Sequence, residues 1–316
     1  MSSPSLPAVS TGLRLGAVFP TSDIGDDPVA IRDFAQGVEE LGLDHLITYD
    51  HVLGADHADR DPPLTGPYTE RDAFHEPFVL FGYLAAVTWR LELVIGVLVL
   101  PQRQTALVAK QAAEVALLSG GRLRLGIGSG WNWVEYDALG VPFRARGRRL
   151  EEQVDVLRRL WTEPLVTLHG EHHDIERAGI LPMPDRSIPV WFGGGAEAQL
   201  RRAARIGDGF LASRADERAR GHARQVLAFR AEEGRMSLGD GDEGTFAVAG
   251  MLDWAHGPDA CAEAIVAWRD AGGTHLALRT FDTLAGRIGV PTLGYTSVDE
   301  HLDALARFRD VAAGVL

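Results

Sequence analysis

Short apolar runs alternate with helix-period segments along most of the chain. Several of these runs are apolar at consecutive positions, which is the pattern of parallel strands buried on both faces. Eight such runs predict strands over Leu13–Phe19, His45–Tyr49, Leu91–Leu100, Leu123–Gly128, Pro189–Phe192, Gly209–Ala212, Thr245–Met251 and His275–Arg279.

Helical periodicity fills the intervals between these strands. In the first interval, Ile31, Phe34 and Val38 recur at the spacing of one helix face. The expected helices cover residues 31–41, 74–88, 107–118, 150–161, 197–206, 216–233, 259–271 and 298–308. Three glycines stand where a helix should end: Gly42, Gly120 and Gly272.

Eight β/α units in series predict an α/β fold, a closed (β/α)8 TIM barrel, over the alternative of a doubly wound open sheet with a second domain. We expect a disordered Ser- and Pro-rich tail over residues 1–12 and a single domain over 13–316. Three connections, 51–73, 130–146 and 162–187, are too long for plain turns. The first two follow strands, which places them at the C-terminal mouth, where barrel enzymes hold their sites.

Composition narrows the function classes. With 31 basic and 44 acidic residues, the formal net charge of −13 argues against nucleic-acid binding. Cys261 is the only cysteine, which excludes a disulfide framework and a cysteine-rich metal centre. Lys110 is the only lysine and lies mid-helix, which argues against Schiff-base chemistry. No apolar run approaches the ~20 residues of a membrane span, so we expect a cytoplasmic protein.

The segment Trp191-Phe192-Gly193-Gly194-Gly195 ends a strand just before a helix opens. Glycines let a ligand approach the backbone, and the first helical turn presents free N–H groups to an anion. Arginines follow at Arg201, Arg202 and Arg205. The segment is either a phosphate cradle or a tight βα turn with a solvated arginine face.

A second glycine-rich strand end reads Gly126-Ile-Gly128-Ser129-Gly130-Trp131. It is a weak match to a dinucleotide fingerprint, because no amphipathic helix follows at once. A flat ring could pack against this bare backbone. Trp131 and Trp133 would flank the mouth, where they either stack on a flat substrate or pack a loop.

Tyr49-Asp50-His51 ends the second predicted strand. A histidine at the mouth can move a proton near neutral pH, so His51 is the candidate acid or base, with a plain strand terminator as the alternative. His172 and His173 are interpreted as a solvated hairpin, and no metal site is expected.

Together these segments resemble the bacterial luciferase-like family, in its branch of oxidoreductases that depend on the deazaflavin coenzyme F420. The resemblance extends from about residue 13 to 212. Its matching segments are Glu40–Asp44 through Asp50-His51, Gly96–Pro101, Gly120–Gly130, Arg148–Asp155, and Pro189–Gly195 with Arg201–Gly209.

The resemblance implies a barrel with an inserted segment at about 162–187 and a flavin-like ring in its mouth. It implies that a non-proline cis peptide at Val97-Leu98 backs the ring, that His51 lies near the hydride-bearing carbon, and that Arg201 lies close to the cofactor phosphate. The other implied cofactor contacts are Asp50, Gly128, Gly130, Gly193, Gly194, Gly195 and Ala196.

The sequence departs from the sugar-phosphate dehydrogenases of this branch at Trp131, where those enzymes carry an acid/base glutamate. That substrate is therefore not expected, and a flatter, more apolar one is. The expected activity is hydride transfer between coenzyme F420 and a small organic molecule, in a homodimer.

Three alternatives remain open. The first keeps the fold and binds FMN, as a monooxygenase fed by a separate flavin reductase. The second is a cofactor-free barrel isomerase or lyase that acts on a phosphorylated substrate. The third is a non-catalytic deazaflavin-binding protein.

Overall fold

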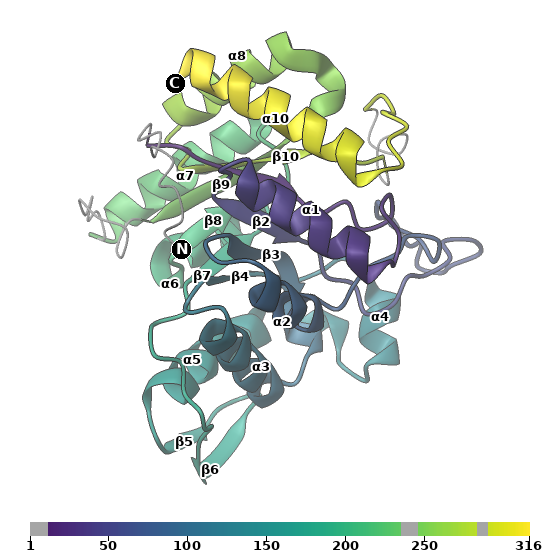
Figure 1. The fold of residues 1–316 in the computed structure, drawn as a ribbon. Helices are drawn as coiled ribbons and strands as arrows, with labels where there is room; N and C mark the ends of the chain where they lie inside the picture. Colours follow the sequence, from purple (N-terminus) through teal and green to yellow (C-terminus); the bar gives the residue numbers. More distant parts are fainter. Residues whose placement is uncertain (1–11, 235–245, 283–289) are drawn as a thin grey trace.

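A computed structural model describes residues 12–234, 246–282 and 290–316 (Figure 1). Eight parallel strands close a barrel in the order β1-β10-β9-β8-β7-β4-β3-β2, which confirms the predicted TIM barrel and all eight predicted strands. The predicted tail lies outside the described residues except for Gly12. The barrel strands are β1 (Arg14–Val18), β2 (His45–Thr48), β3 (Glu92–Val99), β4 (Leu123–Gly128), β7 (Val190–Gly193), β8 (Gly209–Leu211), β9 (Ala247–Asp253) and β10 (His275–Arg279).

Helices surround this barrel and bury their apolar faces against it. The glycines expected at helix ends, Gly42, Gly120 and Gly272, have φ of 77°, 66° and 89°, a conformation that a side chain would strain. The surrounding helices are α1 (Pro28–Glu40), α2 (Pro77–Val87), α3 (Thr105–Leu118), α5 (Arg146–Thr162), α6 (Glu197–Ile206), α7 (Glu217–Glu232), α8 (Gly257–Asp270) and α10 (Val298–Val315). Short 3-10 turns cover Leu100–Gln102, Phe143–Ala145 and Trp254–His256. Among the described residues, no helix is both long and apolar enough to cross a bilayer.

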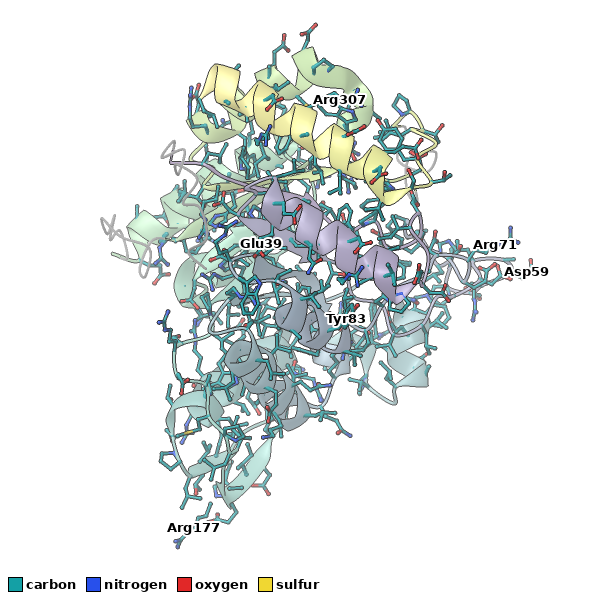
Figure 2. The ribbon with its side chains drawn as sticks, viewed as in Figure 1. Glu39, Asp59, Arg71, Tyr83, Arg177 and Arg307 are labelled. Atoms are coloured by element: carbon teal, nitrogen blue, oxygen red, sulfur yellow. The ribbon has the colours of Figure 1, made fainter. Side chains whose placement is uncertain are left out.

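Two long connections carry secondary structure, of which only the hairpin around His172 and His173 was predicted. Helix α4 (Trp133–Ala138) lies in the loop after β4, and β5 (Val166–His169) with β6 (Asp174–Ala178) forms a hairpin in the 162–187 segment. This hairpin is separate from the barrel sheet and projects beyond α3 and α5 (Figure 1). Figure 2 shows Arg177 of β6 at the lower end of the molecule, well away from Asp59 in the 51–73 loop.

His172 and His173 lie in the turn of the predicted hairpin, but the expectation that they are solvated is wrong. The Nδ1 of His173 lies 2.7 Å from a carboxylate oxygen of Glu152, and its Nε2 lies 2.6 Å from the hydroxyl of Thr105. His173 therefore ties the hairpin to α5 and α3. Its neighbour His172 is half-buried in the same turn.

The N-terminal end of the barrel interior holds a buried histidine pair. The rings of His45 and His275 lie 5.4 Å apart, and neither nitrogen of His45 has a hydrogen-bond partner among the described residues. Burial, reinforced by the positive charges of Arg14 and Arg124, lowers the pKa of His45 to about 3. The folded protein therefore keeps this imidazole neutral.

This neutral imidazole predicts an acid-sensitive fold. The unfolded chain takes up a proton near pH 6.5 that folded His45 accepts only near pH 3, so stability falls as pH drops below about 6.5. His45 alone should account for about 2 kcal/mol of lost unfolding free energy at pH 5. Urea unfolding of the wild type and His45→Asn between pH 7.5 and 5 measures this, with the exposed His256→Asn as control. Equal pH dependence in wild type and His45→Asn would contradict the assignment.

Candidate active site

Three neighbouring strands carry a glycine near the mouth of the barrel, at the last residue of β4 and of β7 and three residues before the end of β3. Gly96, Gly128 and Gly193 lie on β3, β4 and β7, which are adjacent in the sheet. A Cβ added to Gly128 or Gly193 would come 2.6 Å from a γ-methyl of Val97. We call Gly96, Gly128 and Gly193 the glycine floor. A side chain at these positions would meet Val97, or Ile47 and Leu211 in the case of Gly96, so the glycines leave room for Val97, and a flat ring at this half of the mouth would lie against Val97.

The third strand carries a non-proline cis peptide, but not at the expected bond. The cis bond joins Gly96 to Val97, one residue before the expected Val97-Leu98 position. The β3–β4 register shifts between Ile95 and Leu98, as it does at a bulge. The side chain of Leu98 is fully buried in the core between barrel and helices, so it cannot contact a ring in the mouth.

A cavity of about 390 Å³ opens beside the glycine floor. It is lined by Val97 and by the glycine turn of Gly193, Gly194 and Gly195, four of the predicted cofactor contacts. Gly194 has a φ of 108°, and a side chain on Gly195 would collide with the imidazole of His222. The turn therefore requires glycine at both positions, and its backbone is open to a ligand.

The helix after this turn presents free backbone N–H groups to the cavity's edge. Helix α6 starts at Glu197, and its N-cap residue Ala196 offers no side-chain hydrogen bond to the first turn. Such a helix start favours an anion. Sequence analysis correctly found the turn, although Ala196 itself does not line the cavity.

Arg201 does not lie where the resemblance placed it. Its Nε donates to Glu197 at 2.9 Å, and its guanidinium stacks 3.9 Å from the ring centroid of Phe229 on α7. It does not line the cavity. This arginine is thus committed to a contact between α6 and α7.

Other basic side chains line the cavity instead. Arg214 comes from the loop after β8, and Arg218 and His222 come from the first two turns of α7. Arg214 has carboxylate partners in Asp253 and, more distantly, Asp216. Within the described residues, Arg218 and His222 have no hydrogen-bond or ion-pair partner. These two side chains, one helical turn apart, can donate hydrogen bonds to an anionic ligand, and Arg218 also brings a positive charge.

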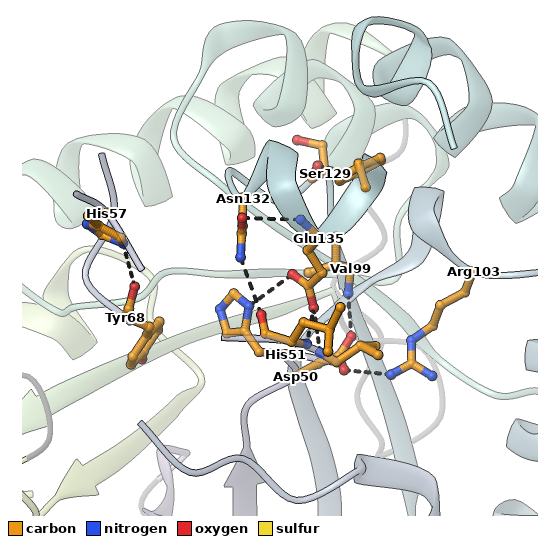
Figure 3. Close-up of polar contacts among 12 residues, drawn as sticks. Asp50, His51, His57, Tyr68, Val99, Arg103, Ser129, Asn132 and Glu135 are labelled. Carbon is orange, nitrogen blue, oxygen red and sulfur yellow. Dashed lines mark hydrogen bonds and ion pairs between the residues drawn. The ribbon is translucent and has the colours of Figure 1, made fainter. Parts of the chain in front are cut away.

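His51 forms a buried pair with a residue that sequence analysis missed. Its Nδ1 lies 3.2 Å from a carboxylate oxygen of Glu135, and the two side chains are 8% and 1% exposed (Figure 3). The other oxygen of Glu135 accepts from the backbone N–H groups of Val52 and Leu53. Burial opposes ionisation of Glu135, but the contacts with His51 and these two amides outweigh it and lower its pKa.

Glu135 reaches His51 because of a short helix. Asn132 caps α4 by accepting from the Glu135 N–H at 3.3 Å, and its side-chain amide donates to the Leu53 carbonyl. The cap sets the first turn of α4 against the loop after β2. Since Glu135 holds Nδ1, the Nε2 of His51 is the nitrogen left for a substrate.

Asp50 turns away from His51. Its carboxylate accepts from the Val99 N–H at 2.9 Å and pairs with Arg103 at 2.6 Å (Figure 3). Burial raises the pKa of Asp50, although Arg103 opposes the rise. Asp50 does not line the cavity. Its place indicates that it positions the end of β3, next to the bulge, rather than contacting the ring.

The two predicted substrate tryptophans lie in different surroundings. The Trp131 ring is 5.7 Å from the His51 ring and packs against Gly66. Trp133, on α4, has Arg60 5.9 Å above its ring. Trp131, with Tyr68 and Phe74, forms an aromatic wall around His51, at ring distances of 5.2 and 4.9 Å for the last two. Gly130, with a φ of 64°, packs on Val99 outside the cavity.

The described residues contain no group of three or more His, Cys, Asp or Glu side chains arranged to hold a metal ion. The site is therefore built from the glycine floor with Val97 against it, a glycine turn beside Arg218 and His222, and a histidine held by a carboxylate.

The sequence profile of luciferase-like monooxygenases matches residues 9–290. The chain belongs to the luciferase-like monooxygenase family. An uncharacterised protein of Mycobacterium tuberculosis is 40% identical over 182 residues, which are 56% of this chain and 62% of that protein. The F420-dependent glucose-6-phosphate dehydrogenase of Kineococcus radiotolerans is 32% identical over 188 residues, 58% of this chain and 52% of that enzyme. The matches thus span between half and two thirds of these relatives.

Solved structures share the fold of this family member. Monooxygenase RslO1 from Streptomyces bottropensis superimposes with a TM-score of 0.74 at 18% identity, covering 96% of this chain and 99% of that one. An F420-dependent secondary alcohol dehydrogenase in complex with an F420-acetone adduct gives 0.70 at 15% identity, covering 95% and 99%. At these identities the likeness shows the barrel and nothing about the ligand.

Proposed function

We propose that this family member is an oxidoreductase that transfers a hydride between coenzyme F420 and a small organic substrate. The observation that carries the proposal is the glycine floor with Val97 against it, which adjoins a glycine turn beside the unpaired side chains of Arg218 and His222. The floor fits a flat ring, and the turn fits the phosphate on its tail. When bound, the deazaflavin supplies a ring carbon that donates or accepts the hydride.

The chain's own residues would orient the reactants and handle the proton. Val97 and the glycine floor hold the ring plane, and the turn at Gly194 and Gly195 holds the tail. His51, fixed by Glu135, exchanges a proton with the substrate through Nε2. The aromatic wall excludes water from this side of the mouth and favours an apolar, planar substrate, in line with Trp131 standing where a glutamate would serve a sugar phosphate.

F420 is preferred to FMN because relatives at 31–35% identity are named F420-dependent dehydrogenases. FMN is the second candidate, since a structural neighbour, a Baeyer-Villiger monooxygenase, is described in complex with FMN. A flavin reductase would then be the partner. A cofactor-free isomerase or lyase would use the anion-binding turn and leave the glycine floor without a role.

Titration of the purified protein separately with F420 and FMN, followed by cofactor fluorescence, tests the proposal. We expect saturable F420 binding and at least tenfold weaker FMN binding. Tight FMN binding without F420 binding would reverse the choice, and binding of inorganic phosphate but of neither ring would favour the isomerase or lyase. A substrate screen that follows the absorbance of F420 then identifies the acceptor or donor.

We also propose that the protein is a homodimer built on α2 and α3. These helices expose Val79, Tyr83 and Leu107, with exposed fractions of 72%, 39% and 53% (Figure 2 labels Tyr83). An apolar surface of this kind on neighbouring helices favours association.

Charges placed on this surface should therefore separate the subunits. We expect Val79→Glu combined with Leu107→Glu to convert a dimer to a monomer in light scattering after size-exclusion chromatography. The matched control is Leu181→Glu, 80% exposed in the 162–187 segment, which should stay dimeric. A monomeric wild type, or a double variant that stays dimeric, would refute the surface.

A further inference from the structure

The side chains at the barrel mouth divide into two unlike halves. Opposite the glycine floor, β9 and β10 contribute Met251, Asp253 and Arg279, and Tyr49 follows β2. Met251 lines the same cavity as Val97 and accepts from the Tyr49 hydroxyl at 3.3 Å. A polar group of Tyr49, Asp253 and Arg279 therefore lies next to Met251, which lines the cavity.

Arg279 in this group is only partly satisfied. Its Nε donates to Asp253 at 2.6 Å, and its Nη1 donates to the Tyr49 oxygen at 3.2 Å. Its Nη2 is buried and has no acceptor among the described residues, although the residue is only 5% exposed. A buried guanidinium N–H without an acceptor is energetically unfavourable. An oxygen atom of a ligand could serve as the acceptor that this N–H lacks.

The Tyr49 hydroxyl is also weakly engaged as a donor. It donates to the thioether sulfur of Met251, and sulfur is a poor acceptor that an oxygen can replace. Burial raises the pKa of Tyr49, with Arg279 opposing, so the hydroxyl keeps its proton at neutral pH. Tyr49 and Arg279 together can thus offer two donors to one oxygen atom.

The surrounding charges favour an electron-rich oxygen. Asp253 is shared by Arg279 and by Arg214, whose Nη2 lies 3.3 Å from it, so two guanidinium groups meet one carboxylate. The Tyr49 ring lies 6.2 Å from Tyr68, and Tyr68 lies 5.2 Å from His51. The donor pair is therefore joined to the histidine by a continuous aromatic surface.

We propose that Tyr49 and Arg279 form a substrate-binding site for an sp² oxygen, the carboxylate or ketone oxygen of a planar, apolar substrate. The oxygen would accept from Arg279 Nη2 and the Tyr49 hydroxyl, with the conjugated carbon skeleton lying between the glycine floor and the aromatic wall. This inference rests on the proposed hydride transfer. In that reaction, the hydrogen bonds from Tyr49 and Arg279 to the substrate oxygen draw electrons from the carbon that reacts.

Three probes of similar shape test the site by calorimetry on the F420-loaded protein: cinnamate, benzalacetone and trans-β-methylstyrene. We expect the wild type to bind cinnamate or benzalacetone at least tenfold more tightly than the hydrocarbon, and the tighter of the two identifies the oxygen as carboxylate or ketone. Arg279→Met and Tyr49→Phe should each remove most of this preference. Arg269→Met, an exposed arginine of α8 paired with Asp270, is the control and should retain it.

Binding of F420 to each variant, measured by fluorescence, separates a substrate role from a structural one. We expect an F420 dissociation constant within about twofold of wild type for Arg279→Met. Loss of F420 binding in that variant, equal wild-type affinity for all three probes, or binding of none of them would overturn the site. A wild type that fails to bind F420 would instead refute the proposed function.

Discussion

Replacing His51 with asparagine is expected to lower turnover by about two to four orders of magnitude, the usual contribution of a positioned acid or base. Asparagine keeps a polar group near Glu135 but cannot exchange a proton at the Nε2 position. Since His51 does not line the cavity at the glycine turn, the F420 dissociation constant should change by less than about twofold. Steady-state turnover and fluorescence titration of the same preparation measure both quantities.

The companion variant Glu135→Gln tests whether the carboxylate orients His51. Glutamine can still accept from the Val52 and Leu53 amides, so the loop should hold while the charge beside His51 is lost. We expect turnover to fall by roughly tenfold or more, as for loss of an orienting partner. Glu163→Gln, at an exposed ion pair with Arg159, should leave turnover unchanged. Full turnover in His51→Asn would overturn the acid/base role of His51, whereas a wild type that binds F420 but turns over no substrate in the screen would favour a non-catalytic deazaflavin-binding protein.

The barrel was predictable because its strands carry their own signal. A parallel strand buried on both faces shows an unbroken apolar run, and Leu123–Gly128 and His275–Arg279 match the predicted strands residue for residue. The hairpin β5–β6 gives no such signal, because most of its residues are half-buried or exposed. The glycine turn was also predictable, because the strand before it and the helix after it are its direct neighbours in the sequence.

The partners that complete the site could not be predicted from local patterns. His51 and Glu135 are 84 residues apart in sequence and meet because the loops after β2 and β4 converge at the mouth. One signal was present: Asn132 three residues before Glu135 is the pattern of a helix start. A helix of only six residues shows too little apolar periodicity to be predicted without this helix-start signal.

The cis bond and Arg201 show the limits of the family resemblance. Counting back from Pro101 placed the bond one residue late, since the β-bulge changes the register there. Arg201 follows the glycine turn closely in sequence, but the direction of its side chain depends on its neighbours. Its guanidinium contacts Glu197 and Phe229 and therefore lies away from the turn. The free cations, Arg218 among them, come from the next β/α unit, which a motif within one unit cannot reveal.

Replacing Arg218 with glutamine is therefore expected to weaken F420 binding about tenfold to a hundredfold, the effect of losing a charge-assisted hydrogen bond to phosphate. Adding His222→Gln should weaken it further, because that imidazole packs on Gly195 in the turn itself. Arg201→Gln is the matched control and should stay within about twofold of wild type, since its guanidinium is committed to Glu197 and Phe229.

Fluorescence titration at low and moderate salt measures these affinities, and the loss should be larger at low salt because Arg218 is exposed. The opposite order, with Arg201→Gln weakening F420 binding and Arg218→Gln neutral, would mean that the phosphate lies on the outer face of α6. The site would then follow the arrangement implied by the sequence resemblance, and the cavity between β7 and α7 would have to serve another part of the ligand.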